Sequence, residues 1–110
     1  MKKRYVELPQ LEKFIDTQST AIKAEYYTII EKLEKNGRLQ MPFAEKIAKT
    51  DLFAIRVINA GNIRVFYVYG LNDRVYGLHG YVKKTRKIPD KEMNKAVKIL
   101  KLMKNKGYVK

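Results

Sequence analysis

The sequence predicts one α+β domain over residues 1–110: an N-terminal helical hairpin, an antiparallel sheet of three to four strands and a C-terminal helix. Two observations support this fold class. Apolar residues repeat with a helical period near both ends of the chain and with a period of two between about residues 52 and 82. The 110 residues contain no linker, repeat or low-complexity tract that would mark a second domain.

The first third of the chain has the pattern of a short strand followed by two helices. Residues 4–8 are rich enough in strand formers to predict a strand that could join the sheet as its fourth member, and residues 10–16 have helical spacing. Ser19 offers an N-cap oxygen for a longer helix, and Asn36-Gly37 is a left-handed stop signal. The apolar stripe of this helix consists of Ile22, Tyr26, Ile29, Ile30 and Leu33.

The middle of the chain changes to strand periodicity. Residues 41–50 indicate a helical turn or loop. Next, three segments rich in β-branched and aromatic residues are separated by the turn sequences NAGN and GLND, which predicts an antiparallel meander. These segments are residues 52–58, 63–69 and 74–82. A last helix is expected to begin at Pro89-Asp90 and to end at Gly107.

Charge is the strongest feature of the composition. Lys and Arg number 24 against 11 acidic residues, a formal net charge of +13, which favours a nucleic acid, an acidic protein or an anionic membrane surface as partner. The chain has no cysteine and one histidine, so disulfides, thiolate metal sites and multi-histidine metal centres are excluded, and we expect no metal and no cofactor. Without a signal peptide or an apolar run of about 20 residues, a soluble cytoplasmic protein is expected.

Cations fall in the middle and at the end of the predicted strands. Alternation places Arg56 and Arg64 on one face of neighbouring strands, and the stretch HGYVKKTRK at residues 79–87 ends the third strand with a cationic cluster. This cluster contains Lys83, Lys84, Arg86 and Lys87. One interpretation is a solvated sheet face. The other is a concave basic surface on the open face of the sheet, with Phe66 and Tyr81 available to stack on bases.

Three strings together resemble a known family. LEKNGRLQMP, LFAIRVINAGNIRVFYVY and VYGLHGYVKKTRKIPDKEMNKA are similar in order and spacing to the phage-derived Gp49-like branch of the RelE/HigB toxins, from about Glu12 to Met103. The resemblance implies a small α+β fold and a type II toxin that cleaves mRNA in the ribosomal A site. It also implies a cognate antitoxin as partner, in this branch usually a helix-turn-helix DNA-binding protein.

The resemblance also implies a set of site residues. Arg56 and Arg64 match the family's strand arginines, and Lys83, Lys84 and Thr85 match its K-K-T motif; Arg86 fills the variable position before Lys87. Ala54 stands where the family often has glutamate, which leaves the cationic face less neutralised. We expect the catalytic residues to be Arg56, Arg64, Lys83, Lys84 and Arg86, and the nucleic-acid-binding residues to be Phe66, Tyr81 and Lys87.

The residue types suit RNA cleavage without a metal. The RNA's own 2′-OH can attack the adjacent phosphate, and fixed Arg and Lys donors stabilise the charge that gathers on the phosphoryl oxygens. A lysine crowded by cations has a lowered pKa, so Lys83 or Lys84 could serve as acid or base near neutral pH. His79, which alternation places on one face with Gly77 and Tyr81, is either a second acid–base candidate or a packed, hydrogen-bonded residue.

Two other functions use the same basic face. One is a non-catalytic RNA-binding or ribosome-binding protein. The other is a protein-interaction subunit that docks an acidic partner. A neighbouring reading frame for a small helix-turn-helix protein favours the toxin, whereas ribosome binding without cut mRNA favours the first alternative.

Overall fold

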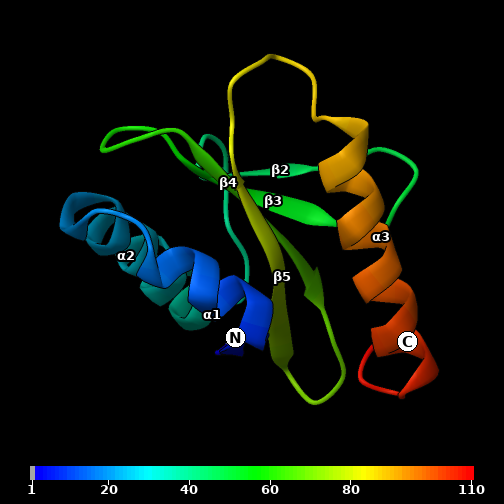
Figure 1. Cartoon of the computed structure of the whole chain (residues 1–110). Coiled ribbons are helices and arrows are strands. Elements are labelled where there is room, and N and C mark those ends of the chain that lie inside the picture. The colour runs from blue at the N-terminus through cyan, green and yellow to red at the C-terminus, as the bar shows by residue number, and fades with distance from the viewer. Residues whose placement is uncertain (1) are drawn as a thin grey trace.

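The structure is a computed structural model that describes residues 2–110, and it contains a five-stranded sheet between two layers of helices (Figure 1). The strands lie in the order β1-β5-β4-β3-β2. β1 runs parallel to β5, and the other neighbours are antiparallel. In chain order the elements are β1 Arg4–Glu7, α1 Pro9–Asp16, α2 Thr20–Asn36, β2 Ala44–Lys46, β3 Phe53–Val57, β4 Ile63–Tyr69, β5 Arg74–Val82 and α3 Asp90–Asn105.

The predicted α+β class is confirmed, but two details of the sheet were wrong. Residues 41–50 are not only loop, because Ala44–Lys46 forms β2 and pairs with β3. A strand of three residues at a sheet edge is too short to show a period of two. The sheet is also mixed rather than antiparallel, since residues 4–7 pair in parallel with residues 74–77. That pairing joins segments about seventy positions apart, so no local pattern records it.

Both faces of the sheet are covered. α1 and α2 pack on one face with the apolar stripe predicted for the longer helix, and α3 packs on the other with Ala96, Leu100 and Met103 (Figure 1). Ser19 caps α2 as expected by accepting a hydrogen bond from the amide of Ile22. The face that carries the arginines was predicted to be open. It is instead partly covered, because α3 buries its apolar stripe there.

Two glycines in β5 let α1 lie directly on the sheet. A Cβ atom at Gly80 would lie 2.6 Å from Phe14 Cδ2, and one at Gly77 would meet the Tyr5 hydroxyl and Leu11. Any larger residue at these positions would therefore push α1 outward. This close packing fixes β5, the strand that leads into the cationic segment.

An irregularity in β5 changes the alternation of its side chains. Phe66 pairs with His79 whereas Tyr67 pairs with Gly77, so Leu78 is an extra residue opposite the β4 strand. Such a bulge inverts the alternation beyond it. Strict alternation predicted that His79 shares a face with Gly77, and this prediction was wrong. His79 points with Phe66 toward α3.

The turn between β3 and β4 is tied to α2 by one carboxylate. Glu25 accepts hydrogen bonds from the backbone amides of Ile58, Asn59 and Ala60, at 3.1, 3.2 and 2.6 Å. Charge-assisted bonds of this kind are stronger than neutral ones. They hold the turn in one position, and Asn62 and Arg64 follow directly after it.

Replacing this carboxylate should loosen the turn without unfolding the domain. We expect Glu25→Ala to lower the free energy of unfolding by about 2 kcal/mol, because three amides lose a charged acceptor but remain partly accessible to water. Urea denaturation measures this, with Glu31→Ala on the exposed side of α2 as the control. Equal stability of the two variants would show that the turn does not depend on Glu25.

Candidate active site

Arg64 lies near the start of β4, the central strand of the sheet. It is the one charged side chain that is buried among residues 2–110, with 4% of its surface exposed. Register places it between Arg56 on β3 and Tyr81 on β5, so these three residues form a row across neighbouring strands. All three lie on the face that α3 covers in part. The prediction that Arg56 and Arg64 lie on one face of the sheet is therefore confirmed.

The guanidinium of Arg64 is held along one edge only. Its Nη1 donates to Asn62 Oδ1 and to the carbonyl oxygen of Ile63, both at 3.2 Å. Its Nε is buried and has no hydrogen-bond partner within the described part of the chain. The Nε–Nη2 edge of a guanidinium is one that binds a phosphate or carboxylate with two parallel bonds. An anion that reached this edge would satisfy a donor that the free protein leaves unpaired.

Asn62 joins the two segments that carry the cations. Its side-chain amide donates to the backbone carbonyl oxygen of Lys83 at 3.0 Å. Its backbone carbonyl oxygen accepts a hydrogen bond from the backbone amide of Lys83 at 2.8 Å. The same side chain accepts from Arg64. One residue thus fixes the backbone at Lys83 and the orientation of the Arg64 guanidinium.

The cations change one another's pKa values. Burial lowers the pKa of Lys83, and Arg64 and Arg56 lower it further, while Glu45 opposes the shift. Burial and Arg56 likewise lower the pKa of Arg64, which still stays charged at neutral pH. Burial raises the pKa of Tyr81, so that its hydroxyl keeps its proton and remains a donor. The charges at this site therefore lie close enough to interact.

The segment that follows β5 projects beyond the end of the sheet before the chain turns into α3 (Figure 1). Lys84, Arg86 and Lys87 are exposed there, and Thr85 donates to the carbonyl oxygen of Lys87 at 2.8 Å. Of the predicted cationic cluster, the structure thus brings Lys83 to the arginine row, while the other three cations extend from the rim.

Residues 13–101 match the family described as phage derived protein Gp49-like (DUF891). The chain belongs to this family. Its fold is also that of a double mutant of the Escherichia coli toxin RelE in the free state, with a TM-score of 0.68 at 11% sequence identity over 89% of this chain and 97% of that one. No curated protein matches the sequence.

Two aromatic residues of this Gp49-like chain are less accessible than predicted. Phe66 has no exposed surface and Tyr81 has 4%, because Phe66 stacks between Tyr81 and His79 while α3 packs over the same face. The expectation that both rings are free to stack on bases was wrong. Tyr81 still offers its hydroxyl, which is buried without a hydrogen-bond partner among residues 2–110.

His79 is a packed residue in this structure. Its Nε2 lies 2.7 Å from Glu92 Oε1 on α3, and its ring lies parallel to that of Phe66 with 6.3 Å between centroids. The bulge at Leu78 directs it toward α3. These contacts agree with the hydrogen-bonded interpretation and join β5 to the start of α3.

Sequence reasoning missed two residues of the site, Asn62 and Glu45. Asn62 appeared only as the last residue of a turn, and its bonds to Lys83 depend on the β4–β5 register. Glu45 lies on β2, which was not predicted, and its Oε1 is 3.9 Å from Arg64 Nε. No short motif in the sequence could have indicated either contact.

Two further observations concern metals and membranes. Among residues 2–110, no group of three or more His, Asp or Glu side chains is arranged to hold a metal ion. In the same part of the chain, no helix combines the length and the apolar character that crossing a bilayer requires.

Removing the hydroxyl of Tyr81 should stabilise the protein. We expect Tyr81→Phe to raise the free energy of unfolding by about 1 kcal/mol, because a buried hydroxyl without a partner pays a desolvation cost. The matched control is Tyr5→Phe, which loses a 2.8 Å bond to the Tyr26 hydroxyl and should lower stability by about as much. Thermal and urea unfolding of both variants measure this difference. A loss of stability in Tyr81→Phe would mean that its hydroxyl is satisfied in the free protein.

Proposed function

We propose that this chain is the toxin of a type II toxin–antitoxin system that cleaves mRNA on the ribosome and so stops translation. Membership of the Gp49-like family and the fold shared with the toxin RelE support the toxin function. The main structural support for the cleavage activity is the buried Arg64, whose Nε lacks a hydrogen-bond partner and whose guanidinium is flanked by Arg56 and Lys83.

This arrangement suits a transition state that gathers negative charge. When the RNA 2′-OH attacks the neighbouring phosphate, the phosphoryl oxygens become more anionic, and donors that are already oriented stabilise them without reorganisation. Asn62 orients the Arg64 guanidinium before substrate arrives, and Arg56 adds a second positive charge beside it. Lys83, with its lowered pKa, is suited to protonate the departing 5′-oxygen.

The projecting segment has a separate role in this proposal. The side chains of Lys84, Arg86 and Lys87 are exposed and positively charged, so they bind the phosphates of mRNA or ribosomal RNA. They set affinity and its salt dependence, while Arg56, Arg64 and Lys83 act on the scissile phosphate. The assignment of Lys84 and Arg86 as catalytic is thereby narrowed to substrate binding.

The partners follow from the same surface. In the cytoplasm the ribosome presents mRNA to the site, and a cognate antitoxin of helix-turn-helix type silences the toxin. A net charge of +13 favours an acidic antitoxin segment that covers Arg56, Arg64 and Lys83. Binding of that segment would stabilise the folded toxin by mass action.

The toxin activity can be tested with a variant that keeps the shape of the site. Arg64→Met retains the buried stem but removes every donor, so we expect expression to leave growth unaffected and mRNA uncut, whereas the wild type arrests growth. In single-turnover cleavage on ribosomes, loss of one such donor costs on the order of 3 kcal/mol, about a hundredfold in rate. Mapping of mRNA ends after brief induction gives the same comparison in cells.

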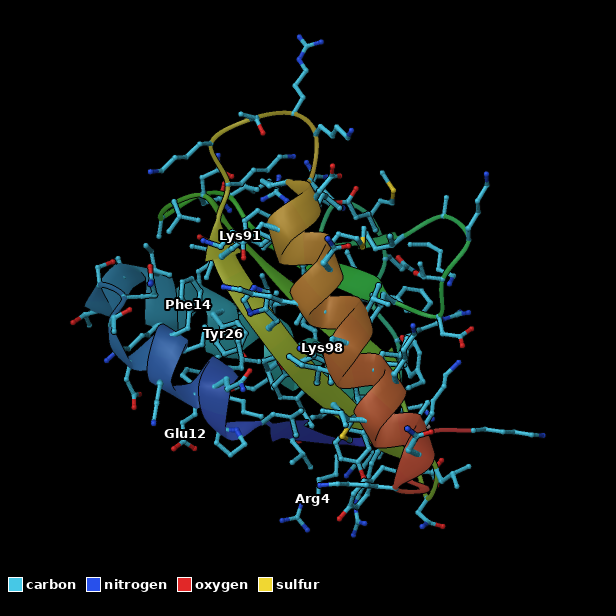
Figure 2. All side chains as sticks on the ribbon, turned by 45° about the vertical axis from the view of Figure 1, so that its right-hand side comes forward. Arg4, Glu12, Phe14, Tyr26, Lys91 and Lys98 are labelled. Atoms are coloured by element: carbon cyan, nitrogen blue, oxygen red, sulfur yellow. The ribbon has the colours of Figure 1, made fainter. Side chains whose placement is uncertain are left out.

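The control is Lys98→Met on exposed α3, away from the projecting segment (Figure 2), which should remain toxic. Lys84→Met should weaken ribosome binding and flatten its salt dependence while the bound complex cleaves at the wild-type rate. If Arg64→Met arrests growth and cleaves mRNA at wild-type levels, Arg64 is not a catalytic residue. Ribosome binding by a wild type that leaves mRNA intact would favour the non-catalytic alternative.

The pH dependence of cleavage tests Lys83 as the proton donor. A general acid must be protonated, so the rate should be constant below the pKa of Lys83 and fall as the pH rises through it. Because burial and Arg64 lower the pKa of Lys83, this fall should begin below the ordinary lysine value of about 10.4. Lys83→Arg keeps the charge but does not titrate, so its profile should lack the alkaline decline. The same decline in both proteins would exclude Lys83 as the acid.

A further inference from the structure

Lys83 is a half-buried amine that the strand register places next to the Arg64 guanidinium. Arg64 pairs with Tyr81 across β4 and β5, and Lys83 follows Tyr81 by two positions. Lys83 and Arg64 are therefore diagonal neighbours on one face of the sheet, about 7–8 Å apart and within reach of two long side chains. The two hydrogen bonds between Asn62 and Lys83 fix the backbone at this position.

The surroundings of Lys83 favour the neutral, nucleophilic form of its amine. Burial lowers the pKa of Lys83, and the positive charges of Arg64 and Arg56 lower it further, while Glu45 opposes the shift. Tyr81, the other titratable group of this cluster, keeps its proton and adds no charge. A lysine that is desolvated or next to another cation is an activated nucleophile, because only the neutral amine has a free electron pair.

The open edge of Arg64 determines which reagent reaches this amine. Its Nε is buried without a hydrogen-bond partner in the described part of the chain, and a guanidinium edge binds phosphate with two parallel bonds. Glu45 Oε1 lies 3.9 Å from this Nε, too far for a hydrogen bond, and its side chain is 39% exposed, with room to turn toward solvent. A small phosphate compound with an electrophilic carbon would therefore be held with that carbon beside Lys83.

We propose that Lys83 is a modification site that acyl phosphates acylate selectively. In an acyl phosphate the electrophilic carbonyl carbon is one oxygen away from the phosphorus. The electron pair of the Lys83 nitrogen forms a bond to that carbon, and the C–O bond to the phosphate breaks with its electrons on the phosphate oxygen. The proton lost by the nitrogen passes to the phosphate, and Arg64 stabilises the charge of this leaving group. The products are Nζ-acylated Lys83 and inorganic phosphate.

Acylation of Lys83 would switch off the proposed RNA cleavage, a consequence that rests on the proposed function. An amide nitrogen carries no positive charge and does not protonate the departing 5′-oxygen. The added acyl group would also lie beside Arg64, where the scissile phosphate binds. The modification itself needs neither RNA nor ribosome, so it can be measured on the protein alone.

The experiment incubates the folded full-length chain with acetyl phosphate at neutral pH and follows the acetylation of each lysine by mass spectrometry. Lys83 should react about tenfold faster than Lys84 and Lys98, because a bound reagent is held near the amine. Both controls are exposed, and Lys84 is the next residue in the chain. In urea the Arg64 guanidinium no longer lies beside Lys83, so the three lysines should react at similar rates.

Three variants separate the anion-binding edge from the reactivity of the amine. Arg64→Met should slow acetylation of Lys83 by acetyl phosphate about tenfold. It should have a smaller effect on acetylation by a neutral N-hydroxysuccinimide ester, which does not use the guanidinium. Glu45→Gln should speed both reactions, because Glu45 stabilises the ammonium form of Lys83 and repels a phosphate. Glu12→Gln, exposed on α1 on the other side of the sheet (Figure 2), is the matched control and should behave as the wild type.

The expected result is a preference for Lys83 in the folded wild type that Arg64→Met loses, with thermal unfolding confirming that the variant is folded. Equal rates at Lys83, Lys84 and Lys98 in the folded chain would overturn the proposal. An undiminished preference for Lys83 in Arg64→Met would overturn it as well.

The effect on cleavage is measured separately, so the two proposals can fail independently. If protein acetylated at Lys83 still cuts mRNA at the wild-type rate, Lys83 is a modification site but not the proton donor. If the unmodified wild type does not cut mRNA on ribosomes, the proposed function fails, while the acetylation rates still decide whether Lys83 is a modification site.

Discussion

The buried charge of Arg64 is the constraint on which the site depends. A guanidinium in the central strand of a sheet, with helices on both faces, loses most of its contact with water and needs partners in return. The structure gives it Asn62 and a backbone carbonyl on one edge and leaves Nε unpaired. The fold therefore carries an electrostatic cost at this position. A bound phosphate would relieve this cost, so the feature that weakens the free protein would also favour the binding of an anion.

The rest of the fold keeps that guanidinium in place. Glu25 ties the β3–β4 turn to α2, and the Asn62–Lys83 bonds join the start of β4 to the end of β5. Gly77 and Gly80 allow α1 to lie against β5, which holds the other side of this junction. α3 covers the apolar part of the second face, so the cations meet at the end of the sheet that it leaves accessible. The strands thus orient the Arg64 guanidinium, and the exposed segment after β5 extends its cations into solvent.

Local patterns predicted the elements well, because they depend on side-chain periodicity. Alternation correctly placed Arg56, Arg64 and Phe66 on one face, and the stripe of α2 and its Ser19 cap lie where the sequence indicated. Long-range pairing was beyond the reach of these patterns. β2 is three residues long, the bulge at Leu78 changes the orientation of His79, and α3 covers rings that alternation alone left exposed. Glu45 and Asn62 reached the site through such pairings, which explains why the sequence did not reveal them.

We propose that Arg64, flanked by Arg56 and Lys83, promotes attack by the RNA's own 2′-OH on the scissile phosphate. The most direct measurement compares two mRNAs on programmed ribosomes, one of them lacking the 2′-OH at the cleaved nucleotide, and analyses the product ends. The wild-type protein should cut only the unmodified mRNA and leave a 2′,3′-cyclic phosphate or its 3′-phosphate hydrolysis product with a 5′-OH. Cleavage of the 2′-deoxy mRNA, or products that carry a 5′-phosphate, would exclude attack by the 2′-OH.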